Sequence, residues 1–200
     1  DRPADRLSLL EVIADNYQAL QAYDKAIAYR KQLLELGDLL SLDEKARHLN
    51  QQGVVFWKIG MNEEALQHYE LSLQIYQEIG DRAGEAVTLN NISQIYAARG
   101  DYDIALVHLE QSLEIQQEIG DRAGEGVTLN NISQIYHGRG DYDTALRYLE
   151  QSLKIRQEIG DRAGEGTTLN NLATTAHAQG DYDTALRYME QSLKITHEIG

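Results

Sequence analysis

Apolar side chains recur at helical spacing along most of the chain. Between residues 89 and 96 they fall on every third or fourth position, and they do so again between residues 105 and 119. Such spacing places them on one face of an α-helix, with polar residues on the opposite face. The pattern predicts one helix near residues 82–98 and a second near residues 102–119, joined by a turn at Gly100 and Asp101.

This pair of helices is repeated with a period of 40 residues. Two marker sequences return with that period: Gly-Asp-Arg-Ala-Gly-Glu at residues 80, 120 and 160, and Gly-Asp-Tyr-Asp at residues 100, 140 and 180. Self-similarity of this kind predicts a solenoid, in which each unit buries its apolar face against its neighbours. We expect a single array, a fragment of a longer protein, with repeats near residues 1–40, 41–80, 81–120, 121–160 and 161–200. The first repeat is the most divergent and matches the others only after a shift of one residue.

Glycine and aspartate mark the predicted ends of the helices. Gly80 and Gly100 can take the left-handed conformation that ends a helix, because glycine has no Cβ. Asp81 and Asp101, which follow them, can accept hydrogen bonds from the first-turn amides of the next helix. The chain is therefore predicted to form helical hairpins joined by short turns.

The composition is that of a folded chain with an excess of acid. Hydrophobic residues make up 42% of the chain and charged residues 25%, and the formal net charge is -14. Nucleic acid is not an expected partner, because contacts to phosphates need a surface rich in Lys and Arg. No apolar run reaches the roughly 18 residues of a membrane-spanning helix, so no membrane partner is expected. The absence of Cys excludes disulfides and thiolate chemistry and favours a cytoplasmic location.

The units resemble those of the tetratricopeptide repeat family. Three features carry the resemblance: small residues where helices would cross, an aromatic residue late in the first helix, and Gly before a second helix led by an aromatic residue. The small residues are Ala105, Ala145, Ala185, Ser112, Ser152 and Ser192, and the aromatic residues are Phe56, Tyr96 and Tyr136. The longer unit, with Thr-Leu-Asn-Asn in its first helix, is similar to the repeats of kinesin light chains and of LGN/Pins spindle adaptors. The resemblance implies an all-α, right-handed superhelix of about five helix-turn-helix repeats.

The same resemblance places the first helix of each pair on the concave side, which makes its polar residues candidates for a peptide-binding groove. An Asn amide offers donors and acceptors, so it can pair with the backbone of a bound peptide or helical segment. The candidate residues are Asn50, Gln51, Trp57, Asn90, Asn91, Gln94, Asn130, Asn131, Gln134, His137, Asn170, Asn171, Thr174 and His177.

Some of these residues have a second interpretation that is purely structural. One Asn of each pair can bond to the neighbouring helix while the other reaches the groove. Trp57 either anchors a ligand or packs under the divergent first repeat. His137 and His177 hold equivalent positions and are interpreted as a small imidazole pair. Two His residues without a nearby carboxylate or Cys make a poor zinc site, so we expect neither a metal nor a cofactor.

The resemblance also bears on the charge of the ligand. Cochaperone domains of the family clamp a C-terminal carboxylate with Lys and Arg from their first helices. The comparable positions here are mostly uncharged, and Arg47 and Lys58 are the only cations among them. From the sequence we therefore do not expect a carboxylate clamp.

No catalytic arrangement stands out, because Ser, His and Asp recur identically in the repeats as framework residues. We expect a non-enzymatic scaffold that binds a protein or peptide segment in an Asn/Gln-lined groove. Two alternatives remain open. In the first, the chain is a sensor or autoinhibitory region of a larger signalling ATPase or caspase-like protease. In the second, it is a structural solenoid that associates end to end through uncapped terminal repeats.

Overall fold

The computed structural model describes residues 3–199, with side chains for residues 6–199, and this part of the chain is all-α. Residues 1, 2 and 200, at the outer ends of the predicted array, lie outside the described residues. Within the described part the helices follow in this order: α1 (Pro3–Ala19), α2 (Tyr23–Glu35), a short 3-10 helix η1 (Gly37–Leu39), α3 (Leu42–Lys58), α4 (Asn62–Ile79), α5 (Arg82–Arg99), α6 (Tyr102–Ile119), α7 (Arg122–Gly138), α8 (Tyr142–Glu158), α9 (Arg162–Gln179) and α10 (Tyr182–Ile199).

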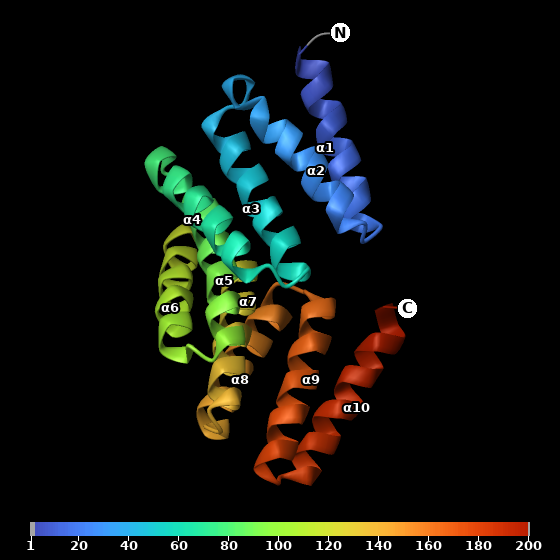
Figure 1. Ribbon diagram of the computed structural model, residues 1–200. Helices are drawn as coiled ribbons and strands as arrows, with labels where there is room; N and C mark the ends of the chain where they lie inside the picture. Colours follow the sequence, from blue (N-terminus) through green and yellow to red (C-terminus); the bar gives the residue numbers. More distant parts are fainter. Residues whose placement is uncertain (1–2, 200) are drawn as a thin grey trace. The chain divides into compact units, whose positions relative to one another are not determined.

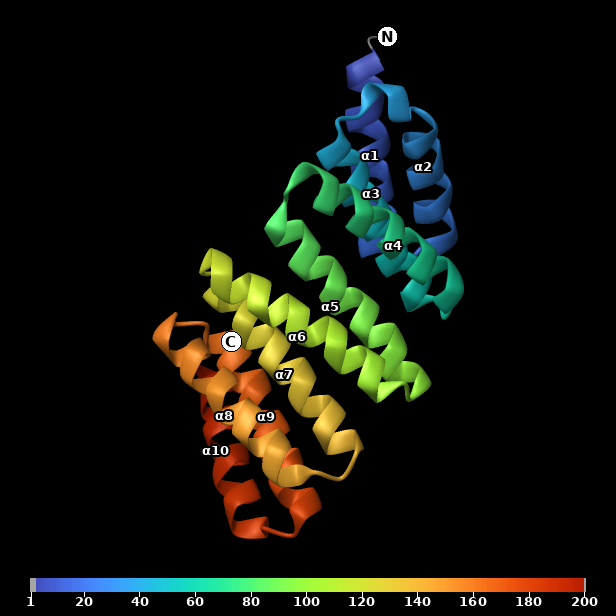
Figure 2. The same ribbon diagram turned by 90° about the vertical axis from the view of Figure 1, so that its left-hand side faces the viewer.

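The chain divides into two compact units, Asp1–Arg99 and Gly100–Gly200, and each is described by itself. Unit 1 contains α1 to α5 and unit 2 contains α6 to α10. The first helices of the pairs (α1, α3, α5, α7 and α9) are called A helices below, and the second helices are called B helices. In unit 1, α1 packs on α2 and α4 packs on both α3 and α5 (Figure 1). In unit 2, α7, α8, α9 and α10 pack each on the next (Figure 2).

The turns between helices confirm the predicted role of glycine. Gly80 and Gly100 have φ of 73° and 85°, in the left-handed region. Asp81 caps α5, because its Oδ1 accepts a hydrogen bond from the amide of Gly84 at 3.0 Å.

The predicted cap at Asp101 is wrong, since its side chain makes no capping hydrogen bond. At the equivalent turn before α8, Asp141 accepts a hydrogen bond from the amide of Thr144 at 3.1 Å. A second hydrogen bond from the Thr144 side chain helps to lower the pKa of Asp141. Ile104 occupies the corresponding position in α6 and has no hydroxyl to hold the carboxylate of Asp101.

Small residues allow the two helices of a pair to approach closely, as the sequence predicts. Ala145 and Ser152 are fully buried. Ser152 Oγ donates a hydrogen bond to the carbonyl oxygen of Gly126 at 2.7 Å, and Ser72 Oγ donates to that of Ala46 at 2.8 Å. Each hydroxyl therefore joins a B helix to the backbone of its own A helix.

Glycine in the first turn of an A helix makes room for a side chain of the preceding B helix. A Cβ built on Gly84 would lie 2.5 Å from Cε1 of Tyr76. The corresponding Cβ on Gly124 would lie 2.7 Å from Nε2 of Gln116. Successive hairpins consequently pack with a B-helix side chain lying over this glycine.

Candidate functional site

The A helices share a face that is not covered by their partner B helices. In α7, Val127 and Gln134 are exposed and Asn131 is partly exposed. The equivalent residues of α9 are Thr167 and Thr174, which are exposed, and Asn171, which is partly exposed. This face, called the A-helix face below, carries most of the predicted groove residues.

Two of the first Asn residues of the predicted pairs, Asn50 and Asn130, form hydrogen bonds across the joint between A helices. Asn50 is buried, and its Nδ2 donates a hydrogen bond to Thr88 Oγ1 at 2.6 Å. Its Oδ1 accepts a hydrogen bond from Asn91 Nδ2 at 3.0 Å. In unit 2, Asn171 Nδ2 donates in the same way to Oδ1 of Asn130 at 2.9 Å. The side chains thus connect successive A helices of one unit.

Other members of the predicted set differ in exposure. Asn90 and Asn130 are buried, whereas Asn170 is exposed. Gln51, Gln94 and Asn131 are partly exposed. The Asn pairs are therefore not uniformly open to solvent.

A hollow opens on the A-helix face of unit 2, between α7 and α9. Its volume is about 270 Å³. It is lined by Ser133, Gln134, His137, Asn171, Thr174 and Thr175. Four of these six residues belong to the predicted groove, and all six are uncharged or imidazole side chains.

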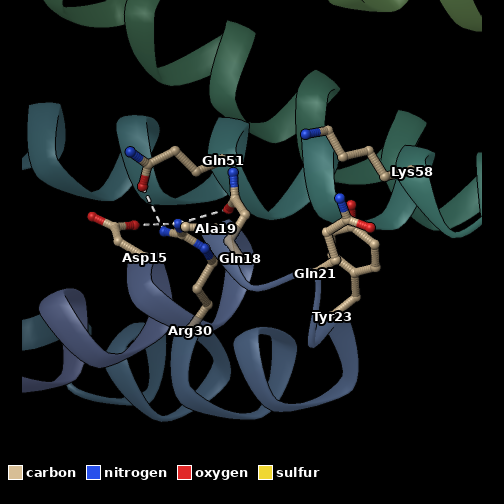
Figure 3. Close-up of a pocket in the computed structure, with 8 residues that line it drawn as sticks. All are labelled: Asp15, Gln18, Ala19, Gln21, Tyr23, Arg30, Gln51 and Lys58. Carbon is tan, nitrogen blue, oxygen red and sulfur yellow. Dashed lines mark hydrogen bonds and ion pairs between the residues drawn. The ribbon is translucent and has the colours of Figure 1, made fainter.

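A second hollow opens in unit 1, where α1, α2 and α3 meet. Its volume is about 360 Å³, and Figure 3 shows its lining. The lining residues are Asp15, Gln18, Ala19, Gln21, Tyr23, Arg30, Gln51 and Lys58. Of the predicted groove residues, Gln51 is present here.

Arg30 is the central charge of this second hollow. Its Nη2 lies 2.5 Å from Asp15 Oδ1 in an ion pair, and its Nη1 donates to Gln51 Oε1 at 2.5 Å. Burial lowers the pKa of Arg30, while the charge of Asp15 and its hydrogen bond act against that shift. A guanidinium nevertheless remains protonated at neutral pH, so the hollow holds a buried cation.

The two hollows occupy equivalent places in their repeats. Asp15 and Gln18 correspond to Gln134 and His137 once the one-residue shift of the first repeat is applied, and Gln51 corresponds to Asn171. The same position between consecutive A helices is therefore hollowed in both units.

Trp57 and the two predicted His residues have well-defined partners. Trp57 is partly buried against the core cluster that includes Phe56 and Tyr69. The ring of His137 packs 5.3 Å from that of Tyr142, and the ring of His177 packs 5.2 Å from that of Tyr182. Each imidazole is held by the Tyr that begins the following B helix.

Sequence reasoning missed several lining residues. Arg30 lies on a B helix, whereas the candidate residues were sought on the first helix of each pair. Asp15 and Gln18 lie in the divergent first repeat, although the one-residue shift noted in the sequence would have aligned them with groove positions. Ser133 and Thr175 line the hollow of unit 2 beside predicted residues.

Two further features bear on what the site can hold. Among residues 3–199, no group of three or more His, Asp or Glu side chains is placed to share a metal ion. None of the helices in the described part of the chain is long and apolar enough to cross a membrane. The chemistry available at the hollows is therefore that of amides, hydroxyls, imidazole and a few charges.

Comparison with known proteins adds evidence on the family. A family model described as Tetratricopeptide repeat matches residues 5–78, 44–118, 84–158 and 124–196. No curated protein matches the chain. Among solved structures, the chain is similar to BtubC (BKLC) from P. vanneervenii, with 24% identity, a TM-score of 0.85, and coverage of 98% of this chain and 83% of that one.

Two other similar structures have lower identity. One is a Podosopora anserina putative kinesin light chain with nearly identical TPR-like repeats, with 18% identity, a TM-score of 0.75, and coverage of 97% and 96% of the two chains. The other is the Rap conjugation gene regulator of the plasmid pLS20 in complex with the Phr* peptide, with 14% identity and a TM-score of 0.80. This chain is covered to 94% in that match and spans 52% of the Rap regulator. Such likeness shows a common fold, and with the family model matching nearly all of the described helices, the chain belongs to the tetratricopeptide repeat family.

Proposed function

We propose that the chain is a scaffold that binds a peptide or helical segment of a protein partner along its A-helix face. The observation that carries this proposal is the pair of hollows at equivalent repeat positions, one in each unit, both lined by side chains of A helices. Hollows at equivalent repeat positions suit the side chains of a bound peptide or helical segment. The peptide complex of the Rap regulator, which has a similar fold, supports this reading.

The exposed polar residues, rather than the buried Asn residues, are the proposed contacts. Gln134 and Thr174 are exposed and line the hollow of unit 2. Asn130 already accepts a hydrogen bond from Asn171 and holds two A helices together. Replacing Asn130 would change the packing of two A helices. Substitutions at Gln134 and Thr174 instead test ligand recognition with little effect on packing.

A peptide-display selection against the full chain provides the test. Peptides selected by the chain should bind Gln134→Ala and Thr174→Ala variants about fivefold more weakly each, the loss of roughly one hydrogen bond of 1 kcal/mol. The matched control is Gln151→Ala, which changes an exposed residue of α8 outside the hollow. If the selected peptides lose no affinity with either groove variant, or lose as much with Gln151→Ala, the A-helix face is not the binding surface.

Self-association is a second candidate because of the exposed side of α10. Leu186, Met189 and Leu193 are exposed there. The equivalent residues of α8 include Leu149, which is buried in a cluster with Leu169 and Leu172 of α9. The same apolar stripe is thus covered inside the array and open on α10, where a second copy could cover it. Light scattering at millimolar concentration should show a mass that rises with concentration and falls back in a Met189→Lys variant; a constant monomer mass would exclude this candidate.

A further inference from the structure

The hydroxyl groups that line the hollow of unit 2 have already used their hydrogens. Thr174 Oγ1 lies 2.9 Å from the carbonyl oxygen of Asn170, and Thr175 Oγ1 lies 2.8 Å from that of Asn171. Ser133 Oγ bonds to a backbone carbonyl of its own helix in the same way. A carbonyl oxygen only accepts, so the single hydrogen of each hydroxyl is donated to the backbone. The hydroxyl oxygens are therefore left as acceptors.

Thr175 thereby fixes the tautomer of His137. Nδ1 of His137 lies 3.2 Å from Oγ1 of Thr175. Because the hydroxyl hydrogen is committed to the backbone, the hydrogen of this contact belongs to Nδ1. In the neutral imidazole Nε2 then carries no hydrogen and can only accept. No residue that the structure describes bonds to Nε2, so this acceptor is available to a ligand.

Thr175 departs from the other repeats at a position that is otherwise apolar. Val55, Ile95 and Ile135 hold the equivalent position in α3, α5 and α7, and all of these side chains are buried, as is Thr175. A buried hydroxyl is costly unless it is hydrogen-bonded. Here the hydroxyl has a partner on each side, and it gives His137 an acceptor that an aliphatic side chain cannot provide.

Asn171 adds a further acceptor. Its Nδ2 donates to Oδ1 of Asn130 at 2.9 Å, and its own Oδ1 bonds to no residue in the described part of the chain. Oδ1 of Asn171, Nε2 of His137 and Oγ1 of Thr174 can therefore all accept from a ligand. The side-chain hydrogens left over in the lining are those on the amides of Asn171 and Gln134. Acceptors thus prevail over donors in this hollow.

The charge of the chain favours a positively charged donor. None of the six lining residues is Lys, Arg, Asp or Glu, so no cation in the lining repels such a group. The formal net charge of the chain is -14, which attracts cations to its surface.

We propose that the hollow of unit 2 binds the ammonium group of a Lys side chain of the peptide ligand, with His137 Nε2, Asn171 Oδ1 and Thr174 Oγ1 as the acceptors. An ammonium group has three donors and no acceptor, which matches these three atoms. Its charge strengthens each hydrogen bond relative to a neutral donor. This inference rests on the proposed binding of peptides at the A-helix face and specifies the side chain that one hollow takes.

Three short peptides serve as probes for the full chain. Acetyl-Ala-Lys-Ala-amide is compared with acetyl-Ala-norleucine-Ala-amide, which has the same length of side chain without the ammonium group. Ala-Ala-Ala-amide, with a free N-terminal amine, offers an ammonium from a chain end. Binding is followed by nitrogen-15 NMR of the His imidazoles at about pH 8, where imidazole is neutral. The Lys probe should bind about tenfold more tightly than the norleucine probe and should shift Nε2 of His137.

The same spectra test the role of Thr175 as a positioning residue. In the free chain Nδ1 of His137 should carry the hydrogen and Nε2 should not. Thr175→Val, which inserts the side chain found at position 55, should shift the tautomer toward hydrogen on Nε2 and weaken the Lys preference. Thr175→Ser keeps the hydroxyl and should restore both. A purely structural role of Thr175 would change stability without moving the tautomer.

Two His substitutions test the acceptor itself. His137→Phe keeps a ring beside Tyr142, 5.3 Å away in the parent chain, but removes Nε2, so the Lys preference should be lost. His197→Phe, at an exposed position of α10 outside the hollow, is the matched control and should leave the preference unchanged.

The outcomes separate this inference from the proposed function. Equal binding of the Lys and norleucine probes, a Lys preference that survives His137→Phe, or no saturable shift at His137 would overturn the ammonium site. Tighter binding of the free-amine probe than of the Lys probe would overturn the choice of Lys. The Gln134→Ala test with selected peptides judges peptide binding at the A-helix face separately, because Gln134 is not one of the proposed acceptors.

Discussion

Leu149→Ala and Met189→Ala form a matched pair of substitutions that tests how the repeats are held together. Residues 141–160 and 181–200 differ at only three positions, one of which is Leu149 against Met189. Leu149 is 1% exposed, and Met189 is 59% exposed. The two side chains thus share a helix sequence and a repeat position, and they differ mainly in what covers them.

The expected difference follows from the cluster around Leu149. This side chain packs with Leu169 and Leu172 of α9. Truncation to Ala removes about three buried carbon groups at roughly 0.8 kcal/mol each and leaves a cavity, so the unfolding free energy should fall by about 3 kcal/mol. Met189→Ala removes surface that already faces solvent and should change the unfolding free energy by less than about 0.5 kcal/mol.

Urea unfolding followed by circular dichroism measures both variants. Because repeat arrays need not unfold in one step, hydrogen exchange of the amides in α8 and α9 provides a local readout. Exchange should speed up in these two helices for Leu149→Ala and stay unchanged for Met189→Ala. Similar losses in the two variants, or a loss for Leu149→Ala below about 1 kcal/mol, would show that the α8–α9 cluster does not stabilise the array as reasoned here.

Three further predictions concern packing and pH. Gly84→Ala should lower the unfolding free energy by about 1–3 kcal/mol, because its Cβ would meet the ring of Tyr76 at 2.5 Å; thermal unfolding that is unchanged would contradict the close packing. Asn50→Ala should lower the unfolding free energy by about 1–3 kcal/mol, since it removes the hydrogen bonds to Thr88 and Asn91 of α5, while Asn170→Ala, at an exposed position, should be nearly neutral in the same urea assay. Burial lowers the pKa of His48 below its usual 6.5, so the unfolded chain binds a proton before the folded one does. The unfolding free energy should therefore be constant above about pH 6.5 and decrease as the pH falls below it, and a His48→Gln variant should lose less over that range; an equal loss would show that His48 is not responsible.

Local features of the sequence were sufficient to predict the helices and their turns. The predicted helix over residues 102–119 coincides with α6, and the helix predicted near residues 82–98 extends to Arg99 in α5. Helical spacing of apolar residues and glycine at helix ends act within a few residues of the chain, so they can be read without knowledge of contacts. The prediction for Asp101 was wrong, since an Asp before a helix does not by itself form a cap: Asp81 and Asp141 accept a first-turn hydrogen bond and Asp101 does not.

The candidate site was only partly predictable, because side-chain roles depend on which helices meet. Gln134, His137, Asn171 and Thr174 were expected at a groove and do line a hollow. Asn50 was expected beside them, yet it is buried in the joint between A helices. The sequence leaves both interpretations of an Asn pair open, since the two residues are adjacent and only packing decides which of them turns inward.

Periodicity was therefore enough to predict the helical hairpins and their stacking in a solenoid, because the same local pattern returns in each repeat. The expected ligand face came from the resemblance of the repeats to the tetratricopeptide family. The tertiary structure was needed to bring Arg30 of α2 beside Gln18 of α1 and Gln51 of α3. It was also needed to show that hollows recur at one position in both units. These arrangements depend on contacts between residues that are distant in the sequence, and the geometry of such contacts is set by how whole helices pack rather than by the spacing of residues along the chain.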